Sequence, residues 1–279
     1  VTRILITIQQ TTPNFFASYH QLLIQKLKLN YVQLRNIILT ARDDVPDDST
    51  PLIGFKFDDE LKSKDGLINI IRNCLSSQLN ETEFSEKAKF IANLLITAYK
   101  DDPEIDEIDE DVDGTSEDFM NLAIPKIFWQ FVIFSLNESA NIVSSNLGIE
   151  SNQYQNLQIS KLFCEIQKIS SNQKGTLFLI YNAIIDQLRY PNKHTTLASL
   201  LIKALFESAN DDLKELLIVC FIKRLLCVTQ PPKSVGLLFK HITLKFQSDI
   251  QRILKQNGEL QLFESAISVI NSFTIRKSK

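Results

Sequence analysis

Apolar residues recur at three- and four-residue spacing along most of this 279-residue chain, which is the period of an amphipathic helix. Leu177, Ile180, Ile184 and Leu188 share one face of a helix that Pro191 prevents from continuing. The spacing predicts helices at about residues 14–29, 31–41, 65–79, 83–99, 116–147 with a break, 153–169, 174–189, 196–208, 212–227, 235–255 and 259–273. The pattern therefore predicts an all-α protein.

The distance between successive predicted helices indicates how they are arranged. From residue 174 onward short corners join the helices, so each helix pair spans about 35–45 residues, as in HEAT-like repeats. Leu213 and Leu217 lie on one apolar face of their helix, and Ile218 and Ile222 lie on another, which is typical of a helix packed between two neighbours. We therefore predict HEAT-like stacked helical hairpins, an α-solenoid, forming a single domain over residues 1–279.

Charge is distributed unevenly along the chain. The stretch Asp101–Asp118 holds eleven acidic side chains and no basic one, which predicts a flexible surface loop or, alternatively, a pseudo-ligand that covers the rest of the protein. Without it the chain has 30 basic and 22 acidic residues, so a net charge of +8 replaces the overall −3. Asp109, Asp111 and Asp113 have EF-hand spacing, but Met120 stands where a bidentate glutamate is needed. We therefore predict no calcium site.

The remaining composition offers no catalytic constellation. Seven glycines leave little room for phosphate-binding loops, and the three histidines are not at zinc-ligand spacing from one another or from a cysteine. The four cysteines stand alone in apolar helical contexts, which predicts buried, reduced thiols. The longest apolar run, Leu216–Ile222, is too short to cross a bilayer. We predict a protein that is not an enzyme, without metal, cofactor or membrane span.

The joint (Gln187–Thr195) concentrates polar and aromatic side chains between two predicted helices. Arg189 and Tyr190 either lock a neighbouring helix end or grip an extended peptide of a partner, and both interpretations remain open. His194 is expected to cap a helix or to contact a partner, with Thr195 or Thr196 as the N-cap of the next helix.

Trp129 is expected in the core, or as a partner anchor if exposed. The candidate partner-binding residues are Arg189, Tyr190, Asn192, His194, Trp129, Phe206 and Leu237.

A second candidate surface follows from the basic C-terminal part of the chain. Between Lys223 and Lys255 there are seven basic residues and one acidic residue, Asp249. We define the C-terminal basic face as Lys233, Lys240, Lys245, Arg252 and Lys255. Spread over a helical surface, these cations form a possible RNA-phosphate patch, although few aromatic residues are interleaved with them. A helical-repeat module that binds RNA directly is therefore the alternative to a protein-binding scaffold.

Several short stretches, in the same order, resemble one family. They are Val32–Leu39, followed by Thr50–Leu52, then the joint, Leu205–Asn210, Arg224–Leu226, Gly236–Leu238 and Leu262–Ala266. The chain resembles the C-terminal homology domain of the Not-one scaffold subunit of the CCR-NOT deadenylase complex over roughly Gln33 to Phe273. One departure is Val235, where the family usually has an aromatic residue.

The resemblance implies a specific role and location. It implies a non-catalytic scaffold domain that docks the heterodimer of the NOT-box subunits Not-two and Not-three or Not-five. Such docking would serve mRNA deadenylation, mRNA decay and translational repression in cytoplasm and nucleus, with RNA-bound repressors as further partners. The chain begins at Val1 without an initiator methionine or an apolar leader, so we interpret it as a fragment of a larger scaffold.

Overall fold

The protein consists of helices throughout the part of the chain that the structure describes. A computed structural model describes residues 1–39, 66–76, 79–101, 124–142, 152–188, 194–225, 233–256, 264–265 and 267–268. The helices are α1 (Thr2–Thr11), α2 (Pro13–Ile24), α3 (Val32–Leu39), α5 (Leu67–Leu75), α6 (Glu81–Lys100), α8 (Lys126–Ile142), η1 (Asn152–Asn156), α9 (Gln158–Ile169), α10 (Lys174–Ile185), η2 (Asp186–Leu188), α11 (Thr195–Ser208), α12 (Asp211–Leu225) and α13 (Lys233–Gln256). No strand occurs among these residues, and the all-α prediction is confirmed.

Most predicted helices are present, with differences at their ends. Helix α1 was not predicted, because its threonines and isoleucines are poor helix formers in isolation. In the folded chain, the buried Gln9 amide of α1 donates a hydrogen bond to the carbonyl of Ile37, 3.0 Å away, which attaches the helix to α3. The N-cap of α11 is His194, whose side chain makes no capping bond, so the prediction of Thr195 or Thr196 was wrong. Thr195 is instead the first residue of the helix.

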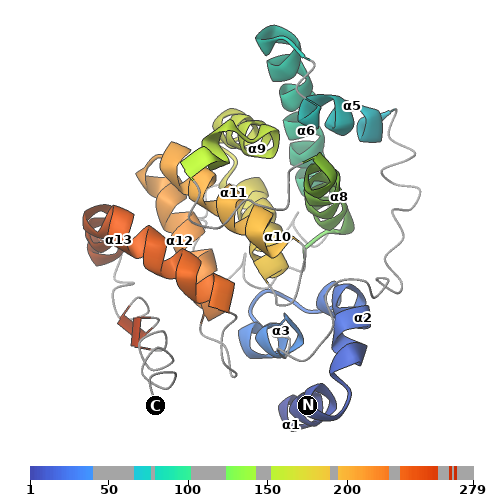
Figure 1. Ribbon diagram of the computed structural model, residues 1–279, viewed down its shortest axis with the longest axis vertical. Coiled ribbons are helices and arrows are strands. Elements are labelled where there is room, and N and C mark those ends of the chain that lie inside the picture. Colours follow the sequence, from blue (N-terminus) through green and yellow to red (C-terminus); the bar gives the residue numbers. More distant parts are fainter. Residues whose placement is uncertain are drawn as a thin grey trace.

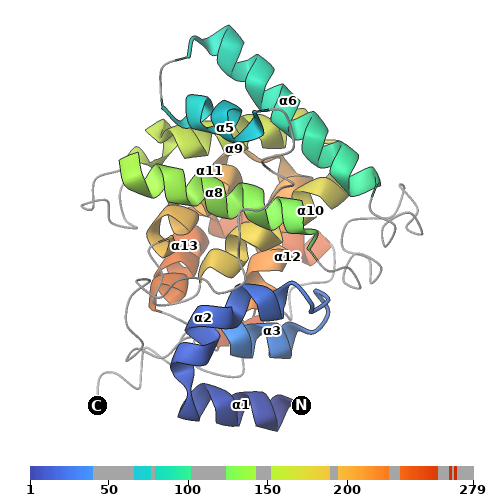
Figure 2. The same ribbon diagram turned by 90° about the vertical axis from the view of Figure 1, so that its right-hand side faces the viewer.

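The helices from α8 onward form two layers, because each packs against the second helix after it. Helices α9, α11 and α13 pack in series in one layer, and α8, α10 and α12 pack in series in the other. Helices α5 and α6 pack together and against α8 and α9 at one end of the molecule (Figures 1 and 2). Packing between alternate helices is the arrangement of stacked hairpins, as the helix spacing predicted.

The core lies between the two layers. Helix α12 packs against both α10 and α13, and its two apolar faces are buried as predicted for a helix between neighbours. Helices α10 and α11 are also buried around most of their circumference. Burial of each leucine, isoleucine or phenylalanine side chain contributes about 1.5–3 kcal/mol. The middle helices therefore supply most of the apolar stabilisation. The polar residues between helices determine how neighbouring repeats are oriented.

Helices α1, α2 and α3 pack on one another and form an N-terminal unit at the opposite end from α6 (Figure 2). This unit contacts the layers through α3, which packs against α12. The connection matters because α3 carries Arg35 and Asn36, the two buried polar residues of the Val32–Leu39 stretch. Both are buried, so the attachment of the N-terminal unit includes polar groups that need partners.

Several predicted features lie outside the described residues. They are the extended segment Asp43–Phe57, the acidic stretch after Asp101, most of the joint (residues 189–193), the end of the predicted helix 212–227 and most of the predicted helix 259–273.

Candidate functional site

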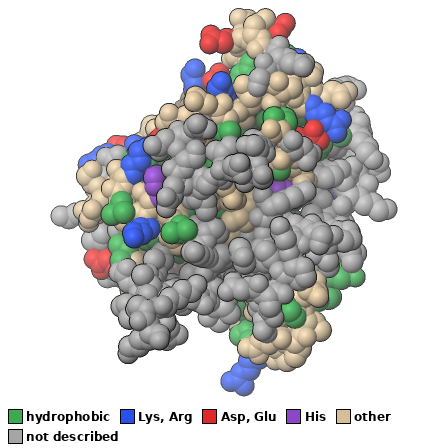
Figure 3. Space-filling view, viewed as in Figure 1, with side chains coloured by type: hydrophobic (Ala, Val, Ile, Leu, Met, Phe, Trp, Pro, Cys, Tyr) green, Lys and Arg blue, Asp and Glu red, His purple; other side chains and the backbone are tan. Residues whose placement is uncertain are grey.

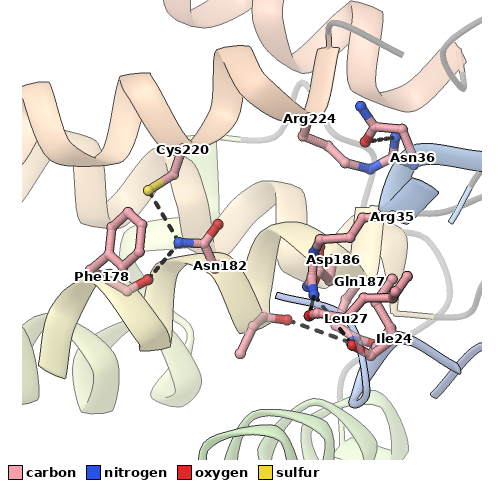
Figure 4. A network of polar contacts seen from close by, with 11 residues as sticks. Ile24, Leu27, Arg35, Asn36, Phe178, Asn182, Asp186, Gln187, Cys220 and Arg224 are labelled. Carbon is pink, nitrogen blue, oxygen red and sulfur yellow. Dashed lines mark hydrogen bonds and ion pairs between the residues drawn. The ribbon is translucent and has the colours of Figure 1, made fainter. Parts of the chain in front are cut away.

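Arg35 joins three helical segments at a buried polar junction (Figure 4). Its guanidinium donates hydrogen bonds to the carbonyl oxygens of Ile24 and Leu27, at 3.3 and 2.7 Å, which lie at the C-terminal end of α2. The same group forms an ion pair with the carboxylate of Asp186 in η2. The last carbonyls of a helix have no partner within that helix. Arg35 therefore satisfies the end of α2 and ties it to the start of the joint.

Arg224 and Asn36 make a second, reciprocal set of contacts at the same junction. Arg224 donates to the side-chain oxygen of Asn36 and to the carbonyl of Leu39, each at 3.1 Å. Asn36 donates in turn to the carbonyl of Lys223, 3.2 Å away near the end of α12. Each helix thus supplies the side chain that satisfies the other's C-terminal end. We call Arg35, Asn36, Asp186 and Arg224 the buried junction.

The buried junction brings together residues of two stretches that carry the family resemblance and one residue next to a third. Arg35 and Asn36 come from Val32–Leu39, Asp186 directly precedes the joint, and Arg224 begins Arg224–Leu226. These positions are far apart in the sequence, and their common role is to hold the N-terminal unit on the helical layers. The interaction expected of Arg189, a guanidinium on the carbonyls of a helix end, is made by Arg35. Sequence reasoning did not single out Arg35 as a site residue, although it lies in the Val32–Leu39 stretch that carries the family resemblance.

The electrostatics of the buried junction are dominated by burial. Desolvation raises the pKa of Asp186 above its ordinary value of 3.8, while the charges of Arg35 and Arg224 and the hydrogen bond from Arg35 act in the opposite direction. Removing two charges from water costs several kcal/mol per ion, and the attraction between them offsets that cost only in part. The ion pair therefore determines which surfaces meet more than it adds to stability.

A second polar cluster lies at the C-terminal end of α11 and centres on Gln167 of α9. The Tyr181 hydroxyl donates to the side-chain oxygen of Gln167 at 2.6 Å, and burial raises the pKa of Tyr181 well above its ordinary value. The Gln167 amide donates to the carbonyl of Leu205 at 3.3 Å and to the hydroxyl of Ser208 at 3.0 Å. Asn210, in the same stretch, caps α12 by accepting from the amide of Leu213 at 3.0 Å. The Leu205–Asn210 stretch therefore joins α9, α10, α11 and α12.

Replacing Gln167 with alanine is expected to lower the free energy of unfolding by about 1–3 kcal/mol, because the buried Tyr181 hydroxyl loses its acceptor. Adding Tyr181→Phe to this variant should cost little more, since the orphaned hydroxyl is then absent. Urea denaturation of both variants measures the difference. If each single variant lost the same free energy of unfolding, and the loss in the double variant were their sum, the hydrogen bond between Tyr181 and Gln167 would be contradicted.

The C-terminal basic face is partly neutralised by acidic side chains of the neighbouring helices. Lys245 forms an ion pair with Glu207 of α11 and donates to the Tyr154 hydroxyl at 3.1 Å. Arg252 pairs with Asp211 of α12 at 2.8 Å, an interaction that holds the pKa of that carboxyl below its ordinary value. Lys240 is exposed, and Lys233 and Lys255 lie in α13 with side chains outside the described ones. Two of the five cations are therefore paired with acidic side chains of the protein itself.

The candidate partner-binding residues separate into three groups. Trp129 and Phe206 are buried in the core, and His194 is buried with its Nε2 atom 2.8 Å from the side-chain oxygen of Asn137. These three side chains help to hold the helices together and are not part of the exposed surface. Leu237 is 41% exposed on α13. Arg189, Tyr190 and Asn192 lie outside the described residues.

The described residues contain no group of three or more His, Cys, Asp or Glu side chains placed to hold a metal ion. None of the described helices is long and apolar enough to cross a membrane. Cys74 and Cys220 are buried free thiols, as predicted, and burial raises their pKa values to about 11 and about 12. They are protonated at neutral pH and serve as small apolar core residues. The free thiol of Cys164 is only partly buried, contrary to the prediction, and Cys227 lies outside the described residues.

Comparison with known proteins agrees with the resemblance. A family model described as "CCR4-Not complex component, Not1" matches residues 1–256. The "General negative regulator of transcription subunit 1" of Schizosaccharomyces pombe is 24% identical over 94% of this chain, which spans 12% of that protein's length. The fold is similar to a solved "Not1 C-terminal domain in complex with Not4", with a TM-score of 0.58 and 22% identity, over 86% of this chain and 49% of the other. The chain belongs to the Not1 family of CCR4-Not complex components.

Proposed function

We propose that this chain is a non-catalytic scaffold domain that docks other subunits of a CCR4-Not complex. The observation that carries the proposal is the match to the Not1 family over residues 1–256. The two layers of helices support it, because stacked hairpins expose long rows of helix ends and faces to partners. By bringing several subunits to one transcript, the domain would raise their effective concentration and so promote deadenylation, decay and translational repression.

We propose two kinds of protein partner. A Not4-like subunit is suggested by the solved Not1 C-terminal domain, which was determined with Not4 bound. The heterodimer of Not-two with Not-three or Not-five is suggested by the family resemblance of the joint and the later stretches. Co-expression of this chain with each partner, followed by size-exclusion chromatography, tests both. We expect stable co-elution, and separate elution from both candidates would overturn the proposal.

Arg189 and Tyr190 are proposed to contact the NOT-box heterodimer. Replacing both with alanine should weaken its capture by about tenfold or more, since arginine and tyrosine are enriched among interface hot spots. Affinity is measured by isothermal titration alongside the melting temperature, with exposed Arg72→Ala as the matched variant. A lower melting temperature with unchanged affinity would assign the two residues to the stability of the joint instead.

A further inference from the structure

The N-terminal unit exposes an unusual share of large apolar side chains. Nine such residues are exposed in the described part of the protein, and five of them lie in residues 1–39: Val1, Ile4, Phe15, Leu22 and Tyr31. Ile4 is 64% exposed and Tyr31 is 49% exposed. The other four are spread over α6, α8 and α13. Single exposed apolar residues are ordinary, but a concentration of them in one unit marks an interaction surface.

Three residues of α2 form a stripe on one face of the helix. Phe15, Tyr19 and Leu22 are four and three residues apart, which places them on one face of the helix. The rings of Phe15 and Tyr19 stack with their centroids 4.9 Å apart, so these two side chains form one packed patch. Figure 3 shows hydrophobic side chains over α1 and α2 at the lower end of the molecule, with a basic side chain at its tip.

The charged side chains of residues 1–39 are all of one sign. Residues 1–39 contain no aspartate and no glutamate. Arg3, Lys26 and Lys28 are exposed, whereas the fourth cation, Arg35, is buried in its ion pair with Asp186. A unit with an exposed apolar stripe, three exposed cations and no acidic side chain is complementary to an apolar segment that carries acidic residues.

We propose that α1 and α2 form a docking surface for an acidic amphipathic segment of a partner protein. This inference rests on the scaffold function proposed above and specifies the chemistry of one partner segment. Apolar side chains of the segment cover Ile4, Phe15 and Leu22, and its carboxylates face Arg3, Lys26 and Lys28. The buried junction contributes by fixing the N-terminal unit on the layers, so the surface is presented in one orientation.

The side chains favour a protein segment over RNA. Ile4 and Leu22 are aliphatic and offer no flat ring on which a base could stack. Phe15 and Tyr19 each have one ring face covered by the other. Three exposed cations also supply few phosphate contacts, and nucleic-acid affinity depends mainly on such contacts.

The test uses the full 279-residue chain and fluorescence anisotropy. The probe is a labelled peptide with leucine and isoleucine at three- and four-residue spacing and glutamate at the other positions, and its counterpart has lysine in place of glutamate. We expect the acidic peptide to bind and the basic one not to bind. Ile4→Gln with Leu22→Gln should weaken binding by about tenfold, the effect of losing about 1.4 kcal/mol. Leu244→Gln, on the exposed side of α13, is the matched control and should bind normally.

A charge reversal completes the test. Lys26→Glu with Lys28→Glu should weaken the acidic peptide and allow the basic one to bind. Equal binding of both peptides by the wild type, no binding of either, or tighter binding of a labelled oligouridylate would overturn the inference. The proposed scaffold function is assessed separately by co-elution with Not4 and the NOT-box subunits, so it stands or fails independently of the peptide result.

Discussion

Replacing Arg35 with methionine is expected to lower the free energy of unfolding by about 3–5 kcal/mol, because the substitution leaves the buried carboxylate of Asp186 without its main partner. The carbonyls of Ile24 and Leu27 lose their donor at the same time. Adding Asp186→Leu should recover most of the loss, since a buried ion pair can often be exchanged for apolar residues of similar volume. Urea denaturation of the two single variants and the double variant measures the coupling.

The same substitution predicts a distinctive dependence on pH. The pKa of Asp186 in the folded protein is already raised above 3.8, and without Arg35 it should rise further. Between pH 3.8 and the folded-state pKa, the folded carboxyl holds a proton that the unfolded one has released. This contribution to stability is present below pH 3.8 and is lost as pH rises through the folded-state pKa. The Arg35→Met variant should therefore gain stability on acidification relative to Arg35→Met with Asp186→Asn.

An exposed ion pair provides the matched control. Arg72 of α5 donates to Glu138 of α8 at 3.1 Å, and its side chain is 52% exposed. Replacing Arg72 with methionine should cost no more than about 1 kcal/mol, because solvent screens such a pair. If Arg35→Met and Arg72→Met lost similar free energies of unfolding, Arg35 and Asp186 would not be coupled as described. The same conclusion would follow if the stability of Arg35→Met and of Arg35→Met with Asp186→Asn changed in parallel with pH.

Replacing Trp129 with alanine is expected to cost about 3–5 kcal/mol, because the indole fills a fully buried site on α8 and its removal leaves a cavity. Trp129→Phe should cost less. It keeps most of the apolar volume and removes the indole N–H, for which the described part of the protein offers no hydrogen-bond acceptor. Thermal and urea denaturation provide the measurement.

Partner affinity then separates the two interpretations of Trp129. At a temperature where Trp129→Ala is still folded, its affinity for the NOT-box heterodimer should match that of the wild type, because the indole is not on the surface. Leu237→Ala is the control for an exposed candidate on α13, and its stability should change by about 0.5 kcal/mol or less. If folded Trp129→Ala lost affinity for the heterodimer without a large loss of stability, Trp129 would instead be a partner-binding residue.

The stretches that identify the family are largely structural in the described part of the molecule. Arg35, Asn36 and Arg224 satisfy helix ends, and the Leu205–Asn210 stretch joins four helices through Gln167 and the Asn210 cap. Such positions are constrained because an unpaired buried polar group costs about 1–3 kcal/mol. The surface proposed for the acidic segment, α1 and α2, lies outside those stretches, whereas Arg189 and Tyr190, proposed to contact the NOT-box heterodimer, belong to the joint. Among the described residues, the stretches of the family resemblance therefore show how the repeats are joined.

The sequence by itself determined the helical class, the stacked hairpins and most helix positions. Apolar periodicity reports which face of each helix is buried, and burial supplies most of the stabilisation. It could not place α1, whose propensity is weak and whose attachment depends on the distant Ile37 carbonyl. Tertiary structure alone decided that Trp129, Phe206 and His194 are interior, and that Lys245 and Arg252 are paired with acidic residues. It alone brought Arg35 to Asp186, because partners 151 positions apart carry no local signal of their contact.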